Sequence, residues 1–227
     1  MRTSNPALKD GVFDRLERTG TGTMTIHGTV NRTALLLFLL VMAACWTWAK
    51  AATGPWILVG ALGGLVLGLV TAFKKTWAPV TAPLYALCEG LFLGALSALY
   101  EARLPGIVVP SVGLTFGVLA ALLAAYTSRL IRPTENFKLG VVAATGGIGL
   151  FYLVLFVLGL FGIHPAFFHG SGPLAIGISA AVAVIAALNL VLDFDFIEKG
   201  AEAGAPKYME WYGAFGLLVT RVWLYLE

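Results

Sequence analysis

Charged residues are scarce in this sequence of 227 residues. Only 12% are Asp, Glu, Lys or Arg, while 59% are hydrophobic and the mean hydropathy is +0.86. Soluble domains carry about 25% charged residues, so this scarcity excludes an ordinary soluble protein. The net charge of +3 is too small to indicate nucleic-acid binding. Apolar segments use nearly the whole length and leave no room for a soluble catalytic domain, so we do not expect an enzyme.

Cysteine and histidine are equally sparse. The two cysteines, Cys45 and Cys88, lie in different apolar segments and show no CxxC or Cys/His spacing. This excludes a disulfide framework or a zinc site as the organising feature. The three histidines, at positions 27, 164 and 169, are too few and too dispersed for a metal cage made of histidines. We therefore expect no cofactor other than a calcium ion, for the reasons given below.

Long apolar segments are what the sequence does contain. Each approaches the ~20 residues that a helix needs to cross a hydrocarbon layer of ~30 Å. Backbone polar groups in lipid must bond within their own segment, so these segments are predicted to be helices. The fold class is thus an all-α integral membrane protein, a bundle of seven transmembrane helices within residues 33–227. The segments are 34–51, 55–73, 82–100, 107–130, 139–163, 173–196 and one that begins near Ala214, or a turn earlier, and reaches Glu227.

The distribution of basic residues predicts the orientation of the bundle. With the amino terminus inside, twelve Lys and Arg residues lie on the cytoplasmic side and only Lys50 and Arg103 lie outside. Such an excess is typical of cytoplasmic loops. Residues 1–32, which are polar and of mixed charge, are then a mobile cytoplasmic tail. The twelve cytoplasmic residues are at positions 2, 9, 15, 18, 32, 74, 75, 129, 132, 138, 199 and 207.

Glycines recur at four-residue spacing in three segments. Such stripes let helix backbones approach closely, and helix packing is the favoured interpretation over a hinge or an ion path. The glycines are at positions 60, 64 and 68, at 90 and 94, and at 113 and 117.

Five ionisable residues fall at membrane depth, where a charge is costly and marks a functional candidate. They are Glu89, Asp193, Asp195, Arg221 and Glu227. Arg221 can neutralise one acid in a purely structural ion pair, but one arginine cannot neutralise four carboxylates. Excess acid inside a bundle indicates a cation or proton path. An aspartyl protease would need a second aspartate opposite Asp193 or Asp195, and the last segment offers only Glu227.

The two aspartates are two positions apart, which turns their side chains about 200° from each other on a helix. Only one of them can therefore face the centre of the bundle. Asn189 lies one turn before Asp193, and we expect it to hydrogen-bond that carboxylate.

Three stretches resemble the transmembrane Bax inhibitor motif family, also called Bax-inhibitor-like proteins, and in particular its bacterial members. They are CEGLFLGALSALY in the third segment, LDFDFIEKG at the end of the sixth, and VWLYLE in the seventh. The resemblance covers essentially the whole chain. It implies one central helix surrounded by the others, in the cytoplasmic (inner) membrane of a bacterium.

The resemblance also implies a function. Characterised members are slow, pH-sensitive calcium leaks, closed when an acid of the sixth helix shares a proton with one of the seventh. Carried over by motif, Asp195 is the preferred acid of the sixth helix and Asp193 the alternate, with Glu227 as the partner in the seventh. Asp195 and Glu227 are then also the expected calcium ligands, and Glu89 matches the glutamate of the third helix.

Two hypotheses follow from the sequence. In the first, carboxyls on three helices gate a cation leak, and Glu89 and Arg221 line the ion path. A shared proton holds the sixth and seventh helices together, and ionisation at higher pH parts them. The alternative is a non-conducting protein that binds a membrane protease or another integral partner in the lipid bilayer. Some bacterial relatives modulate membrane-protein quality control in this way.

Overall fold

The computed structural model describes residues 22–50, 54–131, 133–162 and 172–227. These residues form seven α-helices and one short 3₁₀ helix, Lys75–Trp77, which leads into the third helix. The α-helices are α1 (Ile26–Ala49), α2 (Gly54–Phe73), α3 (Ala78–Arg103), α4 (Val108–Thr127), α5 (Glu135–Leu160), α6 (Pro173–Glu202) and α7 (Met209–Leu226).

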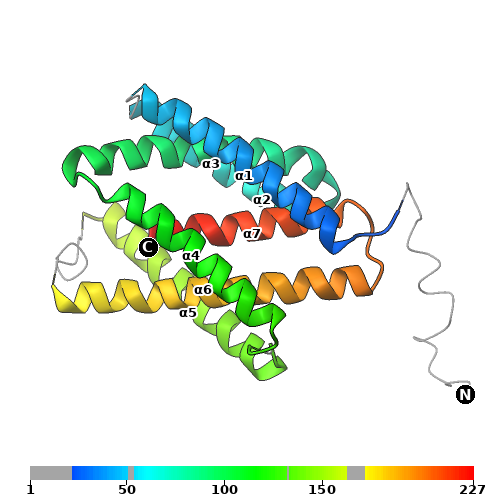
Figure 1. Cartoon of the computed structure of the whole chain (residues 1–227). Coiled ribbons are helices and arrows are strands. Elements are labelled where there is room, and N and C mark those ends of the chain that lie inside the picture. Colours follow the sequence, from blue (N-terminus) through cyan, green and yellow to red (C-terminus); the bar gives the residue numbers. More distant parts are fainter. Residues whose placement is uncertain (1–21, 51–53, 132, 163–171) are drawn as a thin grey trace, which may run out of the picture.

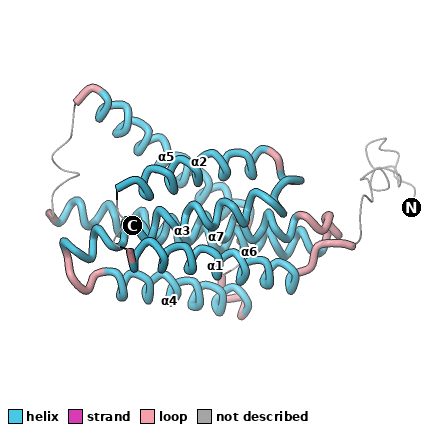
Figure 2. Tube along the Cα trace, turned by 90° about the horizontal axis from the view of Figure 1, so that it is seen from above, coloured by secondary structure: helices cyan, strands magenta, loops and turns pink. Residues whose placement is uncertain are grey.

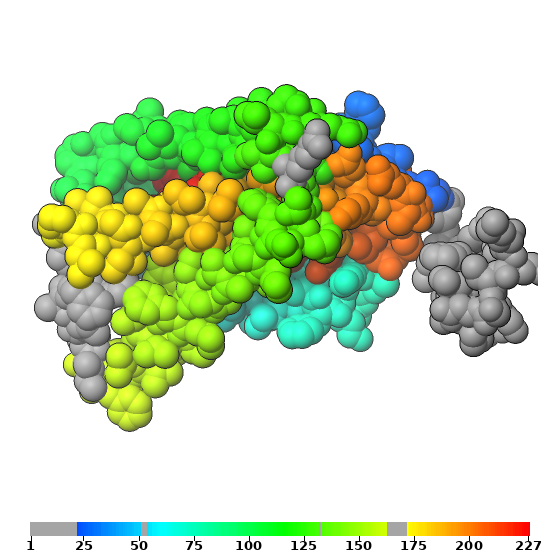
Figure 3. All heavy atoms as spheres, turned by 90° about the horizontal axis from the view of Figure 1, so that it is seen from below, coloured from blue at the N-terminus to red at the C-terminus, as the bar shows by residue number. Residues whose placement is uncertain are grey.

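Helix α7 lies at the centre of the bundle. Figure 1 shows it between α1, α2 and α3 on one side and α4, α5 and α6 on the other. Its buried residues include Phe215, whose ring meets that of Tyr85 on α3 edge to face, with centroids 4.9 Å apart. Seen from below in Figure 3, little of α7 is visible, because the other helices cover it on that face. The central helix implied by the family resemblance is therefore present.

Local sequence signals fix several helix ends. Thr25 caps α1, its Oγ1 accepting from the Gly28 N–H at 2.9 Å, and Thr134 caps α5 through the Phe137 N–H. Pro173 opens α6, where its missing donor costs no helical hydrogen bond. Gly204, at φ +64°, ends α6 in a conformation that side chains disfavour. These residues therefore set where α1, α5 and α6 begin and where α6 ends.

Helices α1, α2 and α3 approach each other closely at glycines. A methyl group on Gly94 would lie 2.2 Å from the carbonyl oxygen of Ala44 on α1, and one on Gly90 would lie 2.3 Å from that of Leu40. A methyl group on Gly60 of α2 would meet the backbone of Phe92 at 2.6 Å. The packing interpretation is confirmed for these stripes. It is wrong for Gly113 and Gly117 of α4, where an added methyl group has no neighbour within 4 Å.

Helices α4 and α5 lie at the periphery. In Figure 2, α5 is inclined to the other helices and its C-terminal half extends away from them. Val141 is the buried residue of α5, and α4 has none. Their apolar side chains, such as Leu114 and Leu150, are more than 60% exposed and match a hydrocarbon solvent.

Six of the seven described α-helices are long and apolar enough to cross a membrane. The exception is α7, which carries Glu210 and Arg221 in 18 residues and packs among the other six. Two predicted boundaries are corrected. Helix α1 begins at Ile26, within the predicted tail of residues 1–32, and α7 begins at Met209, just before the earlier of its two predicted starts. Residues 1–21 of that tail lie outside the described residues.

Candidate functional site

The two aspartates of α6 contact different helices, as their spacing predicted. Asp193 faces α7, where its Oδ2 accepts a hydrogen bond from Thr220 Oγ1 at 2.7 Å. Asp195 faces α5 and forms ion pairs with Lys138 at 2.7 Å and with Lys199 at 3.1 Å. The preference for Asp195 as the acid that meets the seventh helix is therefore wrong, because the rotation of α6 directs the alternate, Asp193, toward α7.

Glu227 lies far from both aspartates. Its carboxylate accepts hydrogen bonds from Tyr152 of α5 at 2.7 Å and from Ser179 of α6 at 3.3 Å. Ser179 and Asp193 are fourteen residues apart on α6, about 21 Å at 1.5 Å per residue. The predicted pairing of Glu227 with Asp193 or Asp195, and a calcium ion shared by Asp195 and Glu227, are thus not formed. The physical reason is that α7 starts next to the end of α6 and runs antiparallel to it.

Glu89 is separate from the other candidates as well. It lies between α3 and α2, next to Tyr85, and a methyl group on Gly64 would meet its carboxylate at 2.7 Å. It lines neither of the cavities described below. Asn189 does not bond Asp193, because its amide donates to Thr145 of α5 at 2.8 Å and to the carbonyl of Ile185.

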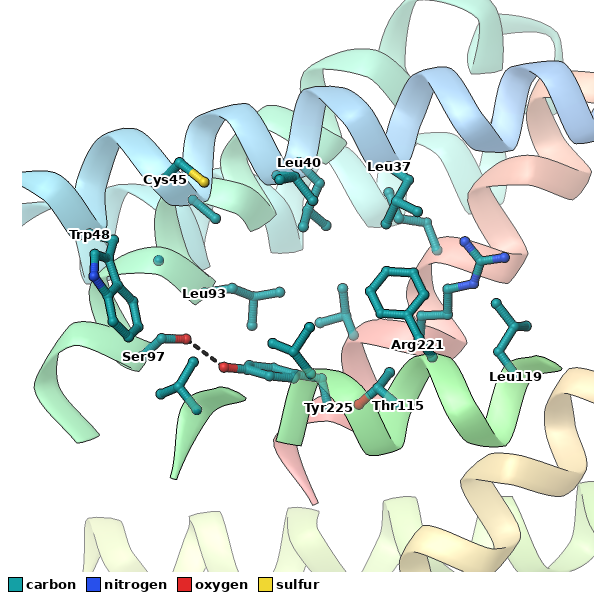
Figure 4. A pocket seen from close by; sticks show the side chains of 18 residues that line it. Leu37, Leu40, Cys45, Trp48, Leu93, Ser97, Thr115, Leu119, Arg221 and Tyr225 are labelled. Carbon is teal, nitrogen blue, oxygen red and sulfur yellow. Dashed lines mark hydrogen bonds between the residues drawn. The ribbon is translucent and has the colours of Figure 1, made fainter. Parts of the chain in front are cut away.

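Two cavities meet at Arg221. The first, which we call the apolar cavity, has a volume of about 430 Å³ and is lined by residues of α1, α3, α4 and α7. The second, the charged cavity, has a volume of about 930 Å³ and lies between α1, α4, α6 and α7. Four residues line both: Leu37, Phe116, Leu119 and Arg221. Figure 4 shows the Arg221 guanidinium leaving α7 toward the space between Leu37 of α1 and Leu119 of α4.

The charged cavity lies beside the end of α6 that carries its acidic residues. Its lining includes carboxylates at Asp195, Glu198 and Glu202 and the cations Lys199 and Arg129, besides Arg221. Tyr126 of α4 donates a hydrogen bond to Glu198 across this cavity. Oxygen donors of this kind suit hard cations. Asp195 is already paired with Lys138 and Lys199, so the carboxylates that remain for a cation are those of Glu198 and Glu202.

Arg221 has one electrostatic counterpart and an incomplete set of hydrogen bonds. The negative charge that acts on it is that of Asp193. Its Nε is buried and has no hydrogen-bond partner in the described part of the chain. A buried unpaired donor costs about 1–3 kcal/mol. Arg221 thus lies where the two cavities meet with an unsatisfied donor, while Asp193 acts on it through its charge and lines neither cavity.

Sequence reasoning missed a buried acid, Glu210, because it placed the start of the seventh segment beyond it. Glu210 is fully buried, and its Oε1 accepts from the N–H of Thr25 at 3.1 Å and from the Thr25 hydroxyl at 2.9 Å. Lys207 lies 2.8 Å from the same oxygen, and Arg32 lies 4.0 Å from Oε2. The sequence signal that could have indicated this contact is Thr25, which precedes the first segment as a helix cap. The unpaired backbone N–H groups at the start of a helix favour a nearby acid.

No group of three His, Cys, Asp or Glu residues that could hold a metal ion occurs within the described ranges.

The fold and these charges define a helical membrane protein with ionisable side chains inside its bundle. The family described as Bax inhibitor 1 like matches residues 5–227, and the chain belongs to this family. No curated protein and no solved structure matches the chain.

Proposed function

We propose that this protein is a pH-sensitive cation leak, with calcium as the expected ion, whose barrier is Arg221. The observation that carries the proposal is that the charged and apolar cavities share Arg221 in their lining. Membership in the Bax-inhibitor-like family supports it. The proposal includes a membrane crossing by all seven helices and an amino terminus in the cytoplasm.

The proposed path begins in the charged cavity. Under this orientation, the acidic end of α6 faces the cytoplasm, and the carboxylates of Glu198 and Glu202 attract cations there. A cation that continues toward the apolar cavity must pass the guanidinium of Arg221. A fixed positive charge ~4 Å away opposes a unit cation by about 4 kcal/mol at an effective dielectric constant of ~20. Such a barrier slows passage by roughly three orders of magnitude.

Asp193 sets the height of this barrier. When its carboxyl group is ionised, its negative charge offsets that of Arg221 and cations pass. When the carboxyl group is protonated, the charge of Arg221 is uncompensated and blocks them. The other charges that face this region are the carboxylates of the charged cavity, Lys199 and Arg129. The sign follows directly: the leak increases as pH rises and Asp193 loses its proton. A carboxyl pair between α6 and α7 is not needed.

Calcium flux into proteoliposomes tests the proposal, with an entrapped fluorescent indicator and empty liposomes as background. The wild-type protein is expected to leak above background and to leak faster as the pH rises. Arg103→Gln serves as a control, because that side chain is exposed and lines neither cavity. A wild-type flux equal to that of empty liposomes would refute the leak. Co-purification of a membrane protease would then favour the non-conducting interaction protein.

A further inference from the structure

The apolar cavity has the walls of a lipid-binding site. Hydrophobic side chains such as Leu40, Leu93 and Leu218 line it, and its volume of about 430 Å³ lies within the ~300–1,000 Å³ typical of ligand pockets. At one end Ser97 and Tyr225 hydrogen-bond each other at 2.6 Å, as Figure 4 shows. One of these hydroxyls donates to the other, so this end carries no charge and is otherwise apolar.

The opposite end of the cavity presents a cation. The Arg221 side chain reaches the lining, and its buried Nε has no hydrogen-bond partner among the described residues. Asp193 does not fill this role, because no hydrogen bond joins it to Arg221 Nε within the described ranges. A guanidinium offers several donors in one plane and binds a carboxylate through two parallel hydrogen bonds. This end of the cavity is therefore complementary to an anionic head group.

The length of the cavity is suited to a single hydrocarbon chain. Its lining on α1 extends from Leu37, beside Arg221, to Trp48. These positions are eleven residues apart, roughly 16 Å along the helix at 1.5 Å per residue. Several lining residues, including Val41, Trp48 and Phe116, are also about 40% exposed on the outside of the bundle. An amphiphile dissolved in the bilayer can thus enter sideways, without passing through water.

We propose that the apolar cavity is a binding site for a long-chain fatty acid, with its carboxylate on Arg221 and its chain between α1 and α4. A neutral chain of the same length fills the cavity equally well but leaves the guanidinium unpaired. The site does not rest on the proposed leak, since binding is measured without flux.

The test is photolabelling of the purified full chain in detergent with a diazirine analogue of palmitic acid. Unlabelled palmitate and hexadecanol, which has the same chain length and no charge, serve as competitors. Palmitate is expected to compete at least ten-fold better than hexadecanol. Labelled peptides are expected to come from residues 37–48 of α1 and 108–119 of α4.

Two variants separate the head group from the chain. Arg221→Gln is expected to weaken palmitate competition at least ten-fold, whereas the matched control Arg103→Gln, at an exposed arginine, leaves it unchanged. Val112 lies on α4, which is loosely packed, and Val112→Trp places a larger side chain in the apolar cavity. This variant keeps Arg221 and is expected to abolish labelling. If Arg221→Gln does not fold, Val112→Trp and the comparison of the two competitors on the wild-type protein still test the proposed site.

Three results would overturn the site. The first is equal competition by palmitate and hexadecanol. The second is labelling of folded Arg221→Gln at the wild-type level. The third is label spread evenly over the lipid-facing surfaces, which would indicate annular lipid alone.

Discussion

The charges of Asp193 and Arg221 act on each other, which makes the two residues interdependent. In the described part of the chain, Asp193 accepts a side-chain hydrogen bond from Thr220, which stabilises its ionised form. A hydrogen bond to a charged group contributes about 1.5–3 kcal/mol. The protonation state of Asp193 is therefore sensitive to the hydroxyl of Thr220.

Replacement of Thr220 by valine tests this dependence. Thr220→Val removes the donor to Asp193 at nearly constant volume, so ionisation of the carboxyl group requires a higher pH. The midpoint of the leak's pH profile should move upward by about one unit, since one unit corresponds to about 1.4 kcal/mol. Thr220→Ser, which keeps the hydroxyl, should retain the wild-type midpoint. An unchanged midpoint in the valine variant would show that Asp193 does not set the profile.

Glu210 has a structural role at the residue scale. It ties the start of α7 to the start of α1 through Thr25 and Lys207. Glu210→Ala removes these bonds and leaves the donors of Thr25 unpaired, at an expected cost of about 3 kcal/mol. Its melting temperature in detergent should fall clearly below that of wild type, while that of Glu135→Gln should not. Equal melting temperatures would show that this contact contributes little.

At the scale of elements, glycines divide the bundle into a tight part and a loose part. Gly94→Ala places a methyl group 2.2 Å from the carbonyl oxygen of Ala44 and forces α1 and α3 apart. Overpacking of this kind costs about 1–3 kcal/mol. Gly117→Ala on α4 meets nothing within 4 Å and should be neutral or stabilising by up to ~1 kcal/mol. Thermal unfolding of the two variants side by side should separate them, and equal stability would contradict the packing described for α1 and α3.

The positions of the helices were predictable from the sequence because membrane thickness sets the length of an apolar segment. Six of the seven predicted segments coincide with helices that are apolar enough to cross a membrane. The seventh was placed too late, since Glu210, Trp211 and Tyr212 read as a polar loop. They lie in a helix because the surrounding helices supply partners for Glu210.

The site was less predictable, because it depends on the rotation and direction of helices. Periodicity shows that Asp193 and Asp195 face different ways, but not which of them meets α7. The motif shared with the family suggested Glu227 as the partner. The antiparallel course of α6 and α7 places Glu227 beside Ser179 instead. Arg221 could be singled out from the sequence as an intramembrane charge, but its place between two cavities required the structure.

At the scale of the whole molecule, this arrangement separates Glu227 from the gate. Glu227 bonds Tyr152 and Ser179, about 21 Å along α6 from Asp193. We therefore expect Glu227→Gln to retain the wild-type pH dependence of calcium flux in proteoliposomes. Loss of pH dependence in this variant would restore the carboxyl pair as the gate and refute the role of Asp193 and Arg221.

The most direct test of the account is calcium flux as a function of pH in Asp193→Asn and Arg221→Gln beside wild type. Asp193→Asn removes the counter-charge, so its flux should remain at the low-pH level of the wild type at every pH. Arg221→Gln removes the barrier, so its flux should exceed that of the wild type and lose its dependence on pH. If both folded variants follow the wild-type profile, the charge pair between the two cavities does not control the leak.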